Sequence, residues 1–125
     1  MSKDASDPRK KLGFEGERLA CEHLQRLGYT NIIRNWRCKA GEIDIIAEQG
    51  EQLVFVEVRT RRMTGHFGTA KESINLRKQQ QIRRTAQFYI HQFKKYDKPI
   101  RFDAILVEMS KEGEFLRLEH VQNAL

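Results

Sequence analysis

The alternation of hydrophobic and polar positions predicts two helices and five strands in the order α-β-β-β-α-β-β. In Phe14–Leu27, four apolar side chains point within about 60° of one direction, which is typical of an amphipathic helix: Ala20, Cys21, Leu24 and Leu27. Gly28 then provides a stop signal. A second helix follows the loop Thr60–Thr69 and ends before Pro99, because apolar residues recur at i, i+4, i+7 and i+11. These residues are Ile82, Ala86, Tyr89 and Phe93.

The predicted strands are rich in β-branched and aromatic residues and are separated by turn signals. They are Asn31–Cys38, Ile43–Ala47, Leu53–Arg59, Ile100–Met109 and Phe115–Val121. The second and third strands form a hairpin around Gln49-Gly50. A mixed central sheet flanked by helices would bury all of these apolar faces, so we expect an α/β fold.

Two strands of the predicted hairpin are each interrupted by one acid, Asp44 and Glu57. Side chains alternate along a strand, so Glu57 and Arg59 share a face and lie about 6.8 Å apart. A hairpin loop with an even number of residues would put Asp44 on that face too, within reach of one shared ion, whereas an odd loop would separate the two acids. Structural ion pairing with Arg34, Arg37 or Arg59 explains the spacing equally well.

Glu17 adds a third acid to this set, because it lies about 20° from Leu24 in the middle of the apolar stripe of the first helix. The helix macrodipole favours an acid near a helix N-terminus, but it does not require the buried face. Three inward carboxylates in a basic protein favour a hard cation, Mg²⁺ or Mn²⁺, held by Glu17, Asp44 and Glu57. Such an ion can bind phosphate and activate water for phosphodiester hydrolysis.

The positive charge of the chain points to a polyanionic partner. The formal net charge is +6 over 125 residues, which suits nucleic acid or an anionic membrane surface. Arg59 could orient water or phosphate but cannot be a general base, because its guanidinium stays protonated. Lys78, about 40° from Ile82 on the helix, is either a phosphate contact or an exposed lysine. Arg61 and Arg62 either follow a phosphate backbone from the predicted loop or are simply solvated.

The length of the chain favours one domain, residues 12–125, preceded by a flexible basic arm of residues 1–11. Nothing in the sequence reaches the apolar length of a signal peptide or a membrane span, which favours the cytoplasm and no membrane partner. The two cysteines and four histidines form no metal-binding motif, so neither zinc nor a disulfide framework is expected.

Several short motifs occur together in an order that resembles the YraN-like family of small bacterial proteins. They are Gly13-x-x-Gly16-Glu17-x-x-Ala20, Arg34-Asn35, Gly41-Glu42-Ile43-Asp44, Phe55-Val56-Glu57-Val58-Arg59, Phe67-Gly68, Lys78, Arg101-Phe102-Asp103 and Asn123-Ala124. That family is similar to the PD-(D/E)XK nuclease superfamily and to archaeal Holliday-junction resolvases. The resemblance implies a restriction-endonuclease-like α-β-β-β-α-β core.

The same resemblance implies roles for individual residues. Asp44 and Glu57 match the two motif acids, and Glu17 matches the helix-borne acid of many resolvases. Arg59 stands where the superfamily motif has lysine, and Ile43 stands where it has proline. The change to arginine bears on catalysis, whereas proline is not a ligand.

The function expected from these observations is a magnesium-dependent endonuclease acting on DNA, with branched or structured DNA as the favoured substrate. A homodimer is one expected arrangement, since resolvases of similar fold cut two related strands of a junction. The alternative is a non-catalytic nucleic-acid-binding module that keeps the nuclease fold. An adaptor for an acidic protein is a third alternative, and its DNA affinity would vanish at physiological salt.

Overall fold

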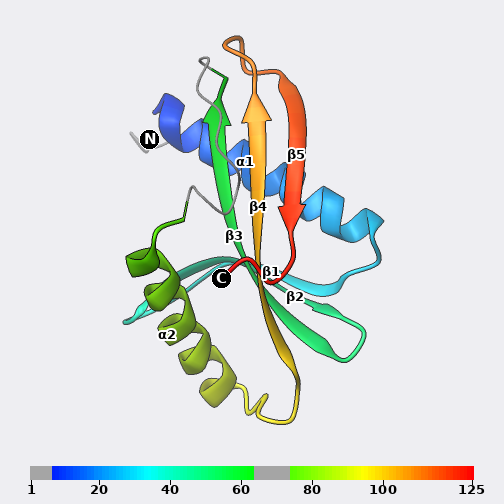
Figure 1. Ribbon diagram of the computed structural model, residues 1–125, viewed down its shortest axis with the longest axis vertical. Helices are drawn as coiled ribbons and strands as arrows, with labels where there is room; N and C mark the ends of the chain where they lie inside the picture. The colour runs from blue at the N-terminus through cyan, green and yellow to red at the C-terminus, as the bar shows by residue number, and fades with distance from the viewer. Residues whose placement is uncertain (1–6, 64–73) are drawn as a thin grey trace.

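Two helices lie on opposite faces of a five-stranded sheet in the computed structural model, which describes residues 7–63 and 74–125 (Figure 1). The strand order is β1-β2-β3-β4-β5; β3 and β4 pair in parallel, and the other neighbouring strands are antiparallel. The elements are α1 (Pro8–Arg26), β1 (Thr30–Cys38), β2 (Gly41–Gln49), β3 (Gln52–Arg62), α2 (Leu76–Gln92), β4 (Ile100–Met109) and β5 (Phe115–Val121). The predicted element order and the mixed sheet are confirmed.

The first helix begins earlier than the sequence pattern predicts. Asp7 caps α1, since its side chain accepts a hydrogen bond of 2.9 Å from the backbone N–H of Arg9, and Pro8 occupies the first helical position, where no donor is needed. Residues 8–11, predicted as part of a flexible arm, are therefore helical, whereas residues 1–6 lie outside the described residues. Neither of the two described helices is long and apolar enough to cross a membrane.

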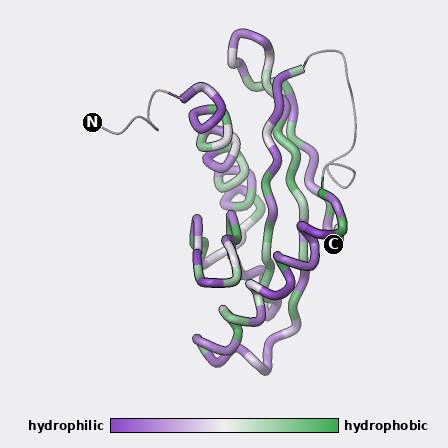
Figure 2. The backbone as a smooth tube through the Cα atoms, turned by 90° about the vertical axis from the view of Figure 1, so that its left-hand side faces the viewer, coloured by the Kyte–Doolittle hydropathy of each residue, from purple (hydrophilic) through white to green (hydrophobic). Residues whose placement is uncertain are grey.

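The sheet separates the core into two layers, one beneath each helix. Ala20 and Leu24 of α1 pack on Val54 and Val56 of β3, whereas Phe55 packs in the other layer with residues of α2. Both faces of β3 and β4 are covered, so these central strands are almost continuously buried. Figure 2 shows α1 on one side of the strands and the C-terminus on the other.

The hairpin between β2 and β3 turns on two residues, Gly50 and Glu51, with Gly50 at a φ of 58°. The two strands pair from Gln49 and Gln52 only as far as Ile45 and Val56. Both strands continue beyond that point, but β3 then pairs with β4 alone, as far as Arg62. The sequence prediction that Arg61 and Arg62 belong to a loop is therefore wrong, because the ladder with β4 extends the strand through both residues.

Side chains of β1 change face at Asn35, whose φ of 55° is left-handed. Arg34 therefore contacts Phe14 and Glu17 of α1, whereas Trp36, only two residues later, packs edge-on against Tyr89 of α2. Their β2 partners, Ile45 and Ile43, likewise belong to different core layers. The register places Asp44 opposite Asn35, at the point where the strands change face.

Candidate functional site

Asp44 and Glu57 meet where the β2–β3 ladder ends. The hairpin loop has two residues, the even number for which the sequence analysis expected the two acids to lie together. The last pair of the ladder is Ile45 with Val56, and the next position along each strand is Asp44 and Glu57. Asp44 Oδ2 accepts a hydrogen bond of 2.8 Å from the backbone N–H of Val58. The Asp44 carboxylate thus accepts a backbone N–H of β3 that would bond to a backbone carbonyl in a regular ladder. This hydrogen bond fixes the position of the carboxylate where the two strands separate.

The electrostatics of Glu57 reflect this crowding of acids. The residue is only 3% exposed, and burial together with the neighbouring Asp44 carboxylate raises the pKa of Glu57 to about 8. Lys78 and Arg59 act in the opposite direction, but they do not outweigh burial. Glu57 therefore lies where little water and too few neighbouring positive charges stabilise an ionised carboxylate beside Asp44.

Glu17 reaches the site from α1, because the helix lies unusually close to β3. A Cβ at Gly16 would lie 1.8 Å from Thr60 Oγ1, so only glycine allows this approach. The Glu17 side chain is 17% exposed, and burial, followed by the charge of Asp44, raises its pKa. The predicted inward orientation is confirmed, with Asp44 lying within electrostatic range of both other acids.

Lys78 points at the carboxylates from the N-terminus of α2. Its Nζ lies 3.5 Å from Glu57 Oε2, and its backbone N–H donates to the Asn75 side chain at 2.9 Å. The cap on this helix therefore holds Lys78 at the sheet. The sequence left open a phosphate contact or an exposed helix lysine; the Lys78 side chain is half-buried against Glu57 rather than freely exposed, and the phosphate contact stays a prediction.

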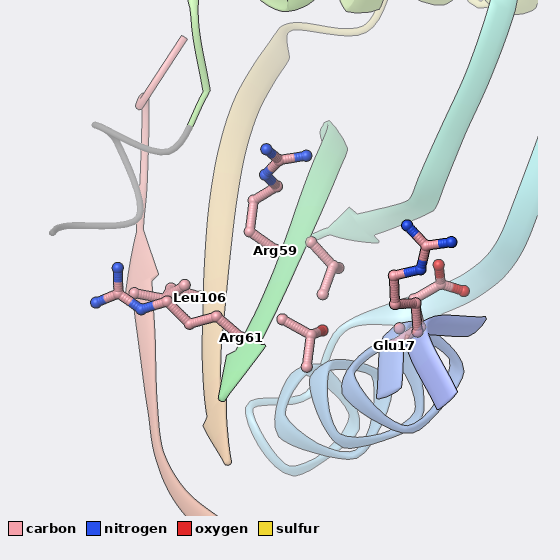
Figure 3. Close-up of a pocket in the computed structure, with 8 residues that line it drawn as sticks. Glu17, Arg59, Arg61 and Leu106 are labelled. Carbon is pink, nitrogen blue, oxygen red and sulfur yellow. The ribbon is translucent and has the colours of Figure 1, made fainter. Parts of the chain in front are cut away.

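The three arginines of β3 differ in their surroundings. Arg59 is exposed, and Figure 3 shows Arg59 and Arg61 on the side of β3 away from Glu17 and α1. Arg61 forms an ion pair of 2.9 Å with the buried Glu108 of β4. Arg62 donates to the backbone carbonyl of Lys111 at 2.7 Å. The charge of Arg61 is thus partly neutralised, which the sequence pattern did not indicate.

A pocket of about 390 Å³ lies between α1 and β3, beside this set of residues (Figure 3). Its described lining includes Glu17, Val58 and Arg59 but neither Asp44 nor Glu57. The three acids are therefore grouped electrostatically around Asp44, although they do not line one cavity.

The donor set is compatible with a hard cation. Within residues 7–63 and 74–125, no three His, Cys, Asp or Glu side chains are arranged as they stand to hold a metal ion. Mg²⁺, however, commonly takes one or two carboxylates and keeps several waters. Asp44 and Glu57 supply two such carboxylates, with Glu17 on the α1 side. A cation there would offset the burial and the repulsion from Asp44 that together raise the Glu57 pKa.

The comparisons with known proteins agree on one family. The sequence profile described as "Uncharacterised protein family UPF0102" matches residues 16–107. The chain belongs to the UPF0102 family. It is 45% identical over 119 residues to a UPF0102 protein of Desulforamulus reducens, covering 94% of this chain and 97% of that one. It is 40% identical over 116 residues to a UPF0102 protein of Caldicellulosiruptor saccharolyticus, covering 93% and 98% of the two chains.

The UPF0102 match agrees with the YraN-like resemblance expected from the sequence. The matched region, residues 16–107, contains every acid and base of the candidate site, from Glu17 on α1 to Lys78 on α2. It ends before β5, which supplies the next feature of this UPF0102 protein.

A second polar network, for which sequence reasoning predicted no role, lies beneath α1. Asp103 is fully buried and accepts hydrogen bonds from Arg101 at 2.9 Å and from His120 at 2.8 Å. His120 in turn contacts His23 of α1 at 3.0 Å, and Arg101 donates to the Tyr29 hydroxyl at 2.6 Å. The sequence signal was the i, i+2 spacing of Arg101 and Asp103, which puts both on one strand face. This network joins α1, β4 and β5.

Proposed function

We propose that this UPF0102 protein is a metal-dependent endonuclease-like protein of the PD-(D/E)XK type that hydrolyses phosphodiester bonds in DNA. The observation that carries the proposal is the meeting of Asp44 and Glu57 at the end of the β2–β3 ladder, with Glu17 beside them. An apolar core does not favour such a group of acids, since each buried charge must be desolvated. A cation site that acts on phosphate accounts for their grouping.

In this proposal Asp44, Glu57 and Glu17 hold Mg²⁺ or Mn²⁺. When bound, such an ion supplies charge stabilisation for the phosphate and lowers the pKa of water. The protein's own part is to fix the carboxylates: Val58 holds Asp44, and the Gly16 contact holds α1 against β3. Branched or structured DNA and a dimeric arrangement stay predictions from the resemblance.

The bases have separate parts in this proposal. Lys78 lies close enough to Glu57 to contact a phosphate bound beside the carboxylates. Arg59, exposed on the far side of β3 from α1, would contact phosphate or orient water without accepting a proton. Arg61 and Arg62 would contact the nucleic-acid backbone further along the strand, with Arg61 weakened by Glu108.

Cleavage assays test the proposal directly. Labelled four-way junction, flap, single-stranded and duplex DNA are incubated with Mg²⁺ or Mn²⁺, and the unmodified protein is compared with Glu57→Ala. We expect metal-dependent cutting that the substitution reduces by at least about 1000-fold, while DNA binding is retained. A matched control is Glu51→Ala in the exposed hairpin turn, which should cut normally. Cutting by Glu57→Ala at the unmodified rate would exclude the proposed site.

A non-catalytic nucleic-acid-binding module is the second candidate, and the replacement of the motif lysine by Arg59 is the observation that favours it. In that case the protein would bind DNA with strong salt dependence and cut none of the four substrates with either metal. Arg59→Lys would then be the informative variant, because recovery of cutting would assign the loss to this position.

A further inference from the structure

Arg34 of β1 presents a guanidinium to the candidate site without a hydrogen-bond acceptor among the described residues. Its Nε and one terminal nitrogen are buried, and neither has a partner within hydrogen-bonding distance. The nearest acid is Glu17, whose Oε1 lies 3.8 Å from that terminal nitrogen. A guanidinium carries five donors in a fixed plane, so two buried donors without an acceptor are unfavourable.

Ion pairing with Glu17 does not account for this geometry. An arginine that pairs with a carboxylate usually donates two parallel hydrogen bonds of about 2.7–2.9 Å. The 3.8 Å between the Arg34 nitrogen and Glu17 Oε1 is well beyond that length. The guanidinium is instead held by Phe14, whose ring centroid lies 5.0 Å from the Arg34 Cζ atom. The aromatic contact and the left-handed Asn35 that follows fix the side chain on the α1 side, with donors left over.

The position of Arg34 relative to the acids suggests what those donors bind. Arg34 pairs with Ile45, the neighbour of Asp44, and approaches from the α1 face. Lys78 approaches Glu57 from the α2 face. The carboxylates are thus flanked by one cation on each side, and a flat donor fork suits the non-bridging oxygens of a phosphate.

We propose that Arg34 is a phosphate-binding residue of this site and contacts the non-bridging oxygens of a phosphodiester held beside Asp44 and Glu57. The inference rests on the proposed function, and it adds a residue for which sequence reasoning gave only a structural role. Arg34 would bind the phosphate directly, and it neither donates nor accepts the proton of the attacking water.

Binding of the dinucleotide pdTpdT in Ca²⁺ tests this without turnover. We expect Arg34→Gln to weaken binding about 10- to 100-fold, the usual effect of losing hydrogen bonds to a charged group. Arg37→Gln is the matched control, because Arg37 lies on the same strand, is 77% exposed at its side chain and pairs with Glu42. That variant should bind like the unmodified protein. The ¹H–¹⁵N signal of Arg34 Nε should also shift when pdTpdT is added.

The double variant Glu17→Gln/Arg34→Gln separates phosphate binding from charge compensation. If Arg34 only offsets the charge of Glu17, the double variant recovers the affinity of Glu17→Gln alone, and the inference is wrong. If Arg34 binds phosphate, the double variant binds pdTpdT more weakly than Glu17→Gln does. Because the double variant adds no unpaired charge, it also keeps the test open if Arg34→Gln alone fails to fold.

The remaining outcomes separate this inference from the proposed function. Unchanged pdTpdT affinity in Arg34→Gln, or no binding of pdTpdT by the unmodified protein, would overturn the role of Arg34. The cleavage comparison with Glu57→Ala would still decide whether the protein is a nuclease. The converse outcome is an unmodified protein that cuts no DNA while Arg34→Gln weakens pdTpdT binding. That result would support the role of Arg34 in phosphate binding and contradict the proposed nuclease activity.

Discussion

The raised pKa of Glu57 predicts that the metal-free protein becomes less stable as pH rises. Below about pH 4.5 the carboxyl is protonated in both folded and unfolded chains, so it contributes no pH dependence. Between pH 4.5 and about pH 8, Glu57 is ionised in the unfolded chain but keeps its proton in the folded chain. The free energy of unfolding therefore falls as the pH rises through this range. Glu57→Gln removes this penalty, because glutamine does not ionise.

The size of the effect follows from the pKa shift. One pH unit corresponds to 1.36 kcal/mol, so a shift from 4.5 to about 8 sets an upper limit of roughly 5 kcal/mol. The Asp44 carboxylate and the Lys78 ammonium act on the Glu57 carboxyl in opposite directions, so the free energy of the shift does not belong to Glu57 alone. We therefore expect Glu57→Gln to gain about 2 kcal/mol in free energy of unfolding, relative to the unmodified protein, between about pH 5 and pH 8.

Urea unfolding in EDTA at several pH values between about pH 5 and pH 9 measures this difference. Glu48→Gln is the matched control on β2: burial opposes ionisation of Glu48, but hydrogen bonds from Asn31 and Lys98 lower its pKa overall. Its contribution is complete above the unfolded pKa and is lost only as pH falls further. The stability difference for Glu48→Gln should therefore be flat over the range in which that for Glu57→Gln rises.

A flat stability difference for Glu57→Gln between about pH 5 and pH 8 would refute the reasoning, because it would mean that Glu57 ionises in the folded chain as easily as in the unfolded one. In contrast, a rise that disappears when Mg²⁺ replaces EDTA would support both the crowding of carboxyls and the proposed cation.

Three further predictions concern other contacts. Gly16→Ala should destabilise the fold by about 1–3 kcal/mol in urea unfolding, because the new methyl group would overlap Thr60 of β3. The control Gly13→Ala has nothing within 4 Å of the new methyl group and should be neutral or stabilising, so equal effects of the two changes would contradict the close contact. Asp103→Asn should cost about 3–5 kcal/mol by the same assay, since it leaves a buried guanidinium without its carboxylate, and a loss below about 1 kcal/mol would argue against the network. If the protein binds DNA, Arg62→Gln should reduce the slope of log K against log salt by about 0.9, and Arg61→Gln by less, because a buried glutamate already pairs with Arg61.

The sequence by itself determined the type and order of the elements, and the direction of several side chains on them. Period-2 alternation in β3 put Glu57 on the face of Phe55, and the helical period turned Glu17 and Lys78 inward, because both patterns follow from local backbone geometry. The predicted bounds of β4 and β5 agree with those of the structure, since turn residues delimit both strands. The acids of the site could therefore be selected without coordinates.

Only the tertiary structure decided how these residues meet. The length of the β2–β3 loop fixed the register of Asp44 against Glu57, and the left-handed Asn35 sent Arg34 and Trp36 to opposite faces, which no regular alternation predicts. The continuation of β3 through Arg61 and the buried partner Glu108 depend on β4, which lies more than 40 residues away in the chain. Pairings between distant segments carry no local signal, so periodicity can nominate the residues of this site but cannot assemble them.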